Sequence, residues 1–327
     1  MGFIQHQISP LYRRRTFSDK FTDTTDFITV NWRVLLRMLT IVLLPLCLLQ
    51  ALNVNTLMSS MYGDMVGNGD VSDTLVGFAL NYGALMVFGI IATVLFICIV
   101  YTLMQLYHEQ NADGTPAHPN LNSITFAQFR PLMMRQVRSA CKAIGAFLLF
   151  FVVLMVFMVV AAVVFATMTT SLGSNEAGVV LVVIFVYAIV LMLLPPIAMV
   201  VPVFSFEKLG FWAGLKKSLV YGFKTWRGVV AVTIVVGLMV GMVLGVLGLP
   251  FLMMTMFKAL FAVQTSGEYT FTNSVWYSFL QYLSAIVYVY ASYIGYAVML
   301  VALAYQYGHA REKIDGDEFF DNANGYD

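Results

Sequence analysis

Long apolar stretches alternate with short polar segments along the whole 327-residue chain. A helix needs about 20 apolar residues to cross the hydrocarbon core of a membrane, and six stretches reach or exceed that length. A membrane β-barrel would instead show strands of about ten residues that alternate in polarity. Because every backbone polar group in lipid must be satisfied internally, the pattern predicts an all-α integral membrane protein with six transmembrane helices, at 34–53, 81–106, 144–168, 179–204, 229–253 and 275–305.

The Lys and Arg residues lie between alternate pairs of these stretches. Seventeen of the 18 fall in segments 1–37, 108–142, 207–227 and 306–327, and Lys258 is the exception. Cytoplasmic loops accumulate Lys and Arg, whereas translocated loops do not. The distribution therefore predicts that both termini are cytoplasmic. The polar first 31 residues do not have the pattern of a cleaved signal peptide, which favours a multi-pass protein of the bacterial inner (plasma) membrane.

Composition supports this interpretation. Apolar residues make up 60% of the chain and charged residues 11%, whereas soluble domains average about 25% charged residues. Six spans and their connections use nearly all of the chain, so we expect a single polytopic membrane domain over 1–327 with no soluble catalytic domain. The acidic segment 314–327 is expected to be a mobile tail.

A weak internal repeat divides the chain into units of approximately 17–107, 124–206 and 208–308. Each unit opens with a 17-residue stretch that begins with phenylalanine and ends with a basic residue at the start of a span, at 17–33, 126–142 and 211–227. Fixed-period similarity is typical of a repeated structural unit, although matches at so few positions also arise by chance. The repeat predicts one amphipathic interfacial helix followed by two spans, three times over.

The second and third opening stretches carry apolar residues every three or four positions, with basic residues on the opposite face. This periodicity is typical of helices that lie in the membrane interface. The basic faces predict binding of anionic lipid headgroups. The alternative is that they only follow the positive-inside pattern while the helices pack against the bundle. The headgroup candidates are Arg33, Arg135, Arg138, Lys142, Lys217, Lys224 and Arg227.

The spans contain few groups that could perform chemistry. They hold no Asp or Glu, and their only cation is Arg37, near the inner boundary. Proton relays and ion-coupled carriers normally need ionisable groups inside the bundle. The four histidines and three cysteines also do not have the spacing of metal ligands. We therefore expect no catalytic residues, no enzyme activity, no metal, no cofactor and no nucleic-acid partner.

Three features within the spans predict packing or a pocket. A stripe of small residues allows close approach of another helix, either within the chain or across a homodimer: Gly237, Gly241, Gly245 and Gly248. Two adjacent prolines, Pro195 and Pro196, predict a kink or break in the fourth span. Tyrosine hydroxyls near mid-membrane must face protein or a wet cavity. Together with the prolines they predict an internal polar pocket, lined by Tyr288, Tyr290, Tyr293 and Tyr296.

One segment resembles a known family. Residues 206–218 read FEKLGFWAGLKKS, and this segment runs on to Trp226-Arg227-Gly228. It is similar to bacterial six-span inner-membrane proteins that include the membrane domain attached to some glycerophosphodiester phosphodiesterases. The resemblance implies the six-span architecture and the bacterial setting. The soluble catalytic barrel of those enzymes has no counterpart in this chain, so their activity is not carried over.

Two functions stay open on this basis. The first is a non-enzymatic inner-membrane protein that binds membrane lipid, or scaffolds a protein partner, through its basic cytoplasmic helices. The alternative is a transporter or flippase-like conduit for a lipid or small apolar solute. A polar cavity reaching mid-membrane beside Pro195 and Tyr290 would favour the conduit.

Overall fold

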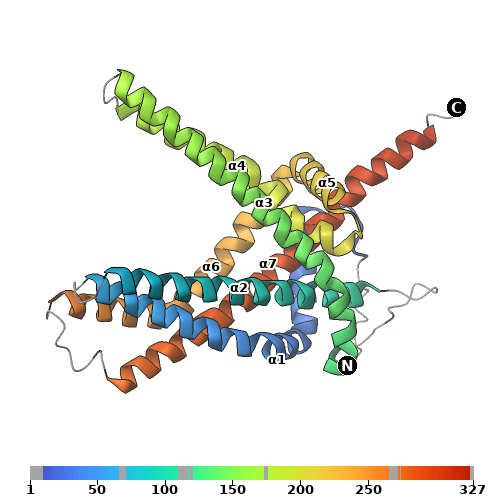
Figure 1. The fold of residues 1–327 in the computed structure, drawn as a ribbon. Helices are drawn as coiled ribbons and strands as arrows, with labels where there is room; N and C mark the ends of the chain where they lie inside the picture. Colours follow the sequence, from blue (N-terminus) through green and yellow to red (C-terminus); the bar gives the residue numbers. More distant parts are fainter. Residues whose placement is uncertain are drawn as a thin grey trace.

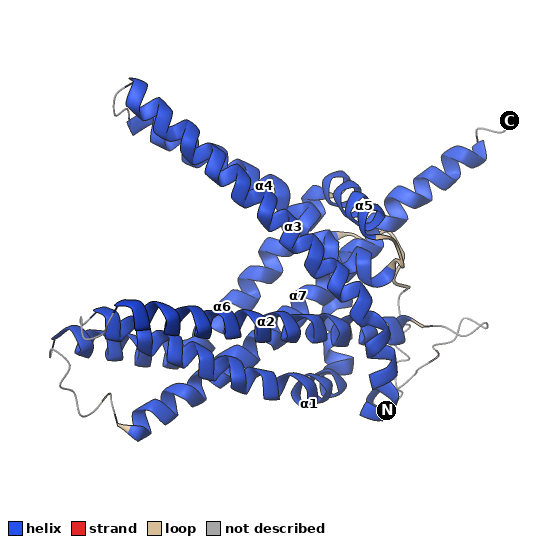
Figure 2. Cartoon of the chain, viewed as in Figure 1, coloured by secondary structure: helices blue, strands red, loops and turns tan. Residues whose placement is uncertain are grey.

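The computed structural model describes residues 10–65, 71–109, 117, 121–172, 176–264, 272 and 274–324. Within these residues all regular structure is helical, which confirms the all-α prediction (Figure 2). The elements in chain order are α1 (Phe17–Met65), α2 (Val71–His108), the short 3-10 helix η1 (Leu121–Ser123), α3 (Phe126–Leu172), α4 (Glu176–Phe206), α5 (Phe211–Lys224), α6 (Trp226–Gln264) and α7 (Val275–Asn324).

Five helices are long and apolar enough to cross a membrane, namely α1, α2, α3, α6 and α7. By their length and composition, these helices indicate a multi-pass membrane protein. In α4 the apolar stretch identified among the described residues is shorter, Leu191–Phe206, although the whole helix has 31 residues. The sixth span therefore stays a prediction.

The helices form two groups that diverge from a common region (Figure 1). In the first group α1 contacts α2 and α7, and α6 packs along α7. In the second, α3 and α4 pair and project away from the rest of the molecule (Figure 1). The outer half of α3 exposes large apolar side chains on every side, including Leu148, Val153 and Val159. An exposed apolar surface of this extent is typical of contact with a membrane or with a protein partner.

The main core lies where the two groups meet. It joins α1, α2, α3, α4 and α7, and its largest fully buried side chains include Tyr101, Phe129 and Phe204. Phe129 belongs to the apolar stripe expected in the second amphipathic stretch, and Met133 and Ala140 of that stripe are buried beside it. The stripe therefore marks the face of α3 that packs on the protein.

The amphipathic stretches do not all form separate helices. In the first two units the helix continues into the span, as α1 and α3, whereas the third unit has a separate α5. Helix α5 ends at Lys224, and the backbone of the next residue, Thr225, leaves the helical region (φ −119°, ψ 24°). At the other end of the chain, α7 continues through the acidic segment to Asn324, where a mobile tail was expected.

Candidate functional site

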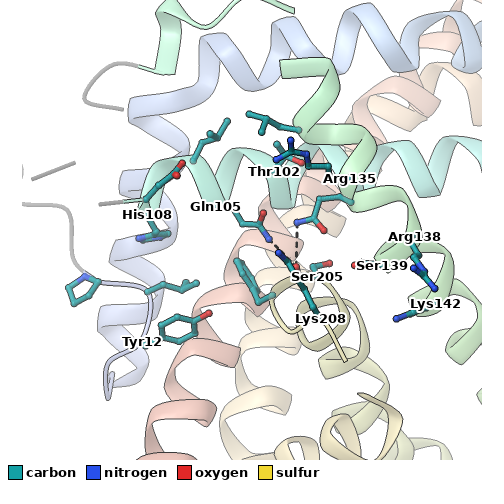
Figure 3. A pocket seen from close by; sticks show the side chains of 17 residues that line it. Tyr12, Thr102, Gln105, His108, Arg135, Arg138, Ser139, Lys142, Ser205 and Lys208 are labelled. Atoms are coloured by element: carbon teal, nitrogen blue, oxygen red, sulfur yellow. Dashed lines mark hydrogen bonds between the residues drawn. The ribbon is translucent and has the colours of Figure 1, made fainter. Parts of the chain in front are cut away.

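A pocket with a volume of about 790 Å³ lies where α2 and α4 end and α3 begins. We call it the basic pocket. Residues 10–12 close one side of it (Figure 3). Its lining contains four cations, Arg135, Arg138, Lys142 and Lys208, and one carboxylate, Glu109. Helix α3 contributes three of the cations and the residues after α4 contribute the fourth.

Hydrogen bonds from the pocket walls hold the end of α4. The last four carbonyls of a helix have no partner within the helix, and Ser205 is the penultimate residue of α4. Its carbonyl accepts hydrogen bonds from Gln105 Nε2 of α2 (2.9 Å) and Gln136 Nε2 of α3 (3.3 Å), as Figure 3 shows. Lys142 Nζ donates to the Leu209 carbonyl at 2.6 Å. These bonds fix the turn that carries Lys208.

Among the described residues that line the basic pocket, the cations outnumber the negative charges. Two helix C-termini, those of α2 and α4, border the pocket, and each carries about half a negative charge. Together with Glu109 they supply about two negative charges. Four cations therefore leave an excess of about two positive charges, so neutralising the helix ends does not account for the whole cluster.

Two buried polar side chains of the basic pocket have no hydrogen-bond partner among the described residues. They are Thr102, through Oγ1, and His108, through both ring nitrogens. Thr102 is 2% exposed. Buried polar groups in proteins normally find a partner. A ligand with oxygen atoms would provide one.

A smaller hollow of about 260 Å³ lies where α5 meets α6, against α7. We call it the second basic pocket. Lys224 and Arg227, two of the predicted headgroup candidates, line it together with Lys313. The predicted candidates thus divide between two pockets, with Arg135, Arg138 and Lys142 in the first.

The two other headgroup candidates are engaged elsewhere. The Arg33 guanidinium lies 5.4 Å from the centre of the Trp32 ring. Lys217 Nζ forms ion pairs with Glu207 (2.8 Å) and Asp315 (3.2 Å). Two carboxylates already balance the charge of Lys217, so we expect it to contribute little to binding an external anion.

Glu207 is also the centre of a polar network that ties α4, α5 and α7 together. Its carboxylate accepts a hydrogen bond from Tyr307 at 2.8 Å, and the Tyr221 hydroxyl donates to Asp315 at 2.8 Å. Burial, the hydrogen bond to Asp315 and the nearby charge of Glu207 together raise the pKa of Tyr221. Its hydroxyl therefore stays protonated and acts as a donor.

The predicted tyrosine pocket is present but mainly apolar. Tyr288, Tyr293 and Tyr296 of α7 line a crevice of about 430 Å³ with apolar residues of α2, α3 and α4. Tyr290 does not line it, and its hydroxyl lies 2.6 Å from Thr40 Oγ1 of α1. The Tyr293 hydroxyl hydrogen-bonds Gln50 of α1 at 3.0–3.1 Å. Two of the four tyrosines, Tyr290 and Tyr293, thus tie α7 to α1.

The adjacent prolines lie outside this crevice. A Cβ atom built on Gly222 of α5 would lie 2.5 Å from Pro196 Cα and 2.8 Å from the Pro195 carbonyl carbon. The two backbones are therefore in direct contact. Pro195 and Pro196 form a surface on which α5 packs.

The glycine stripe of α6 is only partly a packing surface. A Cβ on Gly248 would lie 2.9 Å from the Tyr288 ring of α7, and one on Gly237 would lie 4.0 Å from Met299. A Cβ on Gly241 or Gly245 would meet nothing within 4 Å among the described residues. Of the four glycines, Gly248 is therefore the one in tight contact with α7.

Sequence reasoning missed three groups of residues. Lys208 was not counted among the headgroup candidates, and the polar Gln136 and Gln306 were not recognised as pocket residues. The buried face of α5 was missed as well. Gly214, Ser218 and Gly222 recur there at intervals of four, which is the signal of close helix contact in membranes.

Comparison of the chain with protein-family models, with curated proteins and with solved structures finds no match. The resemblance to phosphodiesterase membrane domains therefore stays a prediction.

Proposed function

We propose that this protein is a non-enzymatic, multi-pass protein of the bacterial inner membrane that binds an anionic lipid headgroup in the basic pocket. In this proposal α4 forms the sixth span, both termini are cytoplasmic, and the pocket lies at the cytoplasmic interface. The observation that carries it is the convergence of four cations around one 790 Å³ space. That volume lies within the roughly 300–1,000 Å³ of ordinary ligand sites.

The types of side chain present favour an anion over a neutral ligand. Arg135 and Arg138 can each form two parallel hydrogen bonds to phosphate oxygens, which is the geometry that guanidinium groups favour. Thr102 and His108 supply buried polar atoms that have no partner among the described residues. A phosphate-bearing headgroup would use both kinds of group.

The conduit alternative has less support. It called for a polar cavity beside Pro195 and Tyr290. Pro195 instead packs against Gly222, Tyr290 bonds Thr40, and the crevice beside the other tyrosines has a largely apolar lining.

The experiment is titration of the detergent-purified full chain with phosphatidylglycerol and phosphatidylcholine, followed by native mass spectrometry. The test variant is Arg135→Gln with Arg138→Gln. The control, Arg33→Gln with Lys216→Gln, removes the same charge from two exposed positions outside the pocket.

Each cation near an anionic lipid contributes about 1 kcal/mol, so the test variant should lose roughly 30-fold in affinity for phosphatidylglycerol. The control should keep most of the wild-type affinity. Equal losses in both variants would show that general surface charge, and not the basic pocket, attracts the lipid.

A further inference from the structure

The second basic pocket carries positive charge that nothing in its own lining balances. Three of the eight residues that line it are the cations Lys224, Arg227 and Lys313, and none of the eight is acidic. The C-terminus of α5 and the N-terminus of α6 meet there. Their opposite dipole ends offset each other, so the positive charge comes from the side chains.

A buried acceptor lies in the same pocket. Gln306 of α7 is fully buried, and its Oε1 has no hydrogen-bond partner among the described residues. Its Nε2 donates to Thr225 Oγ1 at 3.3 Å. The Thr225 hydroxyl in turn donates to the Tyr221 carbonyl at 2.7 Å. The hydroxyl hydrogen is thus already used, which fixes the orientation of the amide and leaves Oε1 as an acceptor without a donor.

An imidazole completes the set of polar groups. His309 lines the pocket, and its Nδ1 accepts a hydrogen bond from the Arg15 backbone amide at 2.9 Å. In a neutral imidazole one nitrogen accepts and the other carries the hydrogen. Nε2 is therefore the donor of this ring.

These groups select a particular chemistry. Cations and an N–H donor suit phosphate oxygens, whereas Gln306 Oε1 needs a hydroxyl or amine donor. A single water molecule needs only about 10–15 Å³ of such space, far less than the 260 Å³ of the pocket. The site therefore has room for a small headgroup with both features.

We propose that the second basic pocket binds a phosphate diester that carries a free hydroxyl group, of the phosphoglycerol class. The phosphate lies among Lys224, Arg227 and Lys313, and the hydroxyl donates to Gln306 Oε1. Trp226, which also lines the pocket, is half-exposed, as is typical of aromatic side chains at a membrane interface. A lipid headgroup is accordingly the source of the ligand, and a free glycerophosphate is the competing source.

The test compares two lipids of equal charge. Phosphatidylglycerol and phosphatidylmethanol each carry one negative charge, but only the first has hydroxyl groups on its headgroup. Both are titrated as short-chain forms into the detergent-purified full chain bearing Arg135→Gln and Arg138→Gln, which weakens the basic pocket. Phosphatidylglycerol should bind about tenfold more tightly than phosphatidylmethanol, because phosphatidylmethanol has no hydroxyl group to donate to the buried Gln306 Oε1.

Three variants test whether that preference arises in the second basic pocket. Gln306→Met should abolish the preference, whereas Lys224→Gln with Arg227→Gln should weaken both lipids by the same factor. Gln306→Glu retains an acceptor and so should retain the preference, even though its charge weakens both lipids. Circular dichroism and a melting curve establish that each variant is folded.

Equal affinity for the two lipids, or a preference that survives Gln306→Met, would overturn the proposal. Competition by sn-glycerol 3-phosphate at the same concentrations would overturn the lipid as the source. Because the Arg135 and Arg138 substitutions are already present, these outcomes do not depend on whether the basic pocket binds lipid. The earlier titration isolates the basic pocket in the same way only in a chain that also carries Lys224→Gln and Arg227→Gln.

Discussion

Substituting Gly222 by alanine tests the contact on which the position of α5 depends. Gly222 is buried, and a Cβ there would lie 2.5 Å from both the Cα and the nitrogen of Pro196. Ordinary van der Waals contacts begin near 3.4 Å. A backbone atom cannot change rotamer to make room, so α5 must move away from α4 by about 0.9 Å.

Two opposing effects determine how far Gly222→Ala lowers the free energy of unfolding. Overpacking of a tight contact costs about 1–3 kcal/mol, and the upper end applies because the obstacle is backbone. Replacing glycine by alanine inside a helix contributes about 1 kcal/mol in the other direction. We therefore expect Gly222→Ala to destabilise the protein by about 2 kcal/mol net.

The matched control is Gly241→Ala in α6, where a Cβ meets nothing within 4 Å among the described residues. This variant should be neutral or slightly stabilised. Melting curves in one detergent, monitored by loss of the monodisperse peak, compare the two. Gly222→Ala should melt several degrees below the control. A melting temperature equal to or above that of Gly241→Ala would refute the close packing of α5 on the prolines.

Two further predictions concern the buried arginine and the topology. The Arg15 side chain is fully buried and its Nε donates to Asp23 at 2.6 Å, so Asp23→Asn leaves an uncompensated buried charge. It should cost about 3–5 kcal/mol, seen as a large drop in melting temperature; a drop of only a degree would contradict this. Cys141 is exposed, whereas the other two cysteines are buried. A membrane-impermeant maleimide should therefore label Cys141 in inside-out vesicles only, and labelling in right-side-out vesicles would reverse the predicted topology.

The helical elements could be predicted from the sequence because the hydrocarbon core of a membrane offers the backbone no hydrogen-bond partners. Without water to satisfy the backbone, a long apolar run must become a helix. The start of α3 was also predictable, since Phe129, Met133 and Ala140 form its buried stripe. The lengths of α1 and α3 could not be predicted from the sequence. Nothing in the local pattern shows that an interfacial stretch continues without a break into the following span.

The orientation of α5 illustrates a different limit. Its large apolar side chains, such as Trp212, are exposed, and its buried face is made of Gly214, Ser218, Tyr221 and Gly222. In water the large apolar side chains would be buried. In lipid they face the tails, and small residues pack on the protein. In α5, unlike at the start of α3, the large apolar side chains such as Trp212 therefore lie on the exposed face, while the spacing of small residues marks the face toward the protein.

The pockets could not be predicted, because each combines segments that are distant in sequence. The basic pocket joins residues 10–12, 102–109, 132–142 and 205–208. Residue spacing shows which side chains share a helix face, but it contains no information about which helices cross. Gln306 is the clearest case, since a lone glutamine near the end of a span gives no sign that it will be buried beside Lys224 and Arg227.

The positive-inside pattern does not explain why the cations converge on two pockets. That pattern requires only that cations stay on one side of the membrane, and scattered, hydrated cations would satisfy it at no electrostatic cost. Five of the seven headgroup candidates instead line two pockets, where like charges repel one another. Lys217 shows how the chain treats a cation that serves structure, since two carboxylates neutralise it. Clusters that keep an excess of positive charge are thus best explained by anions that arrive from outside the chain.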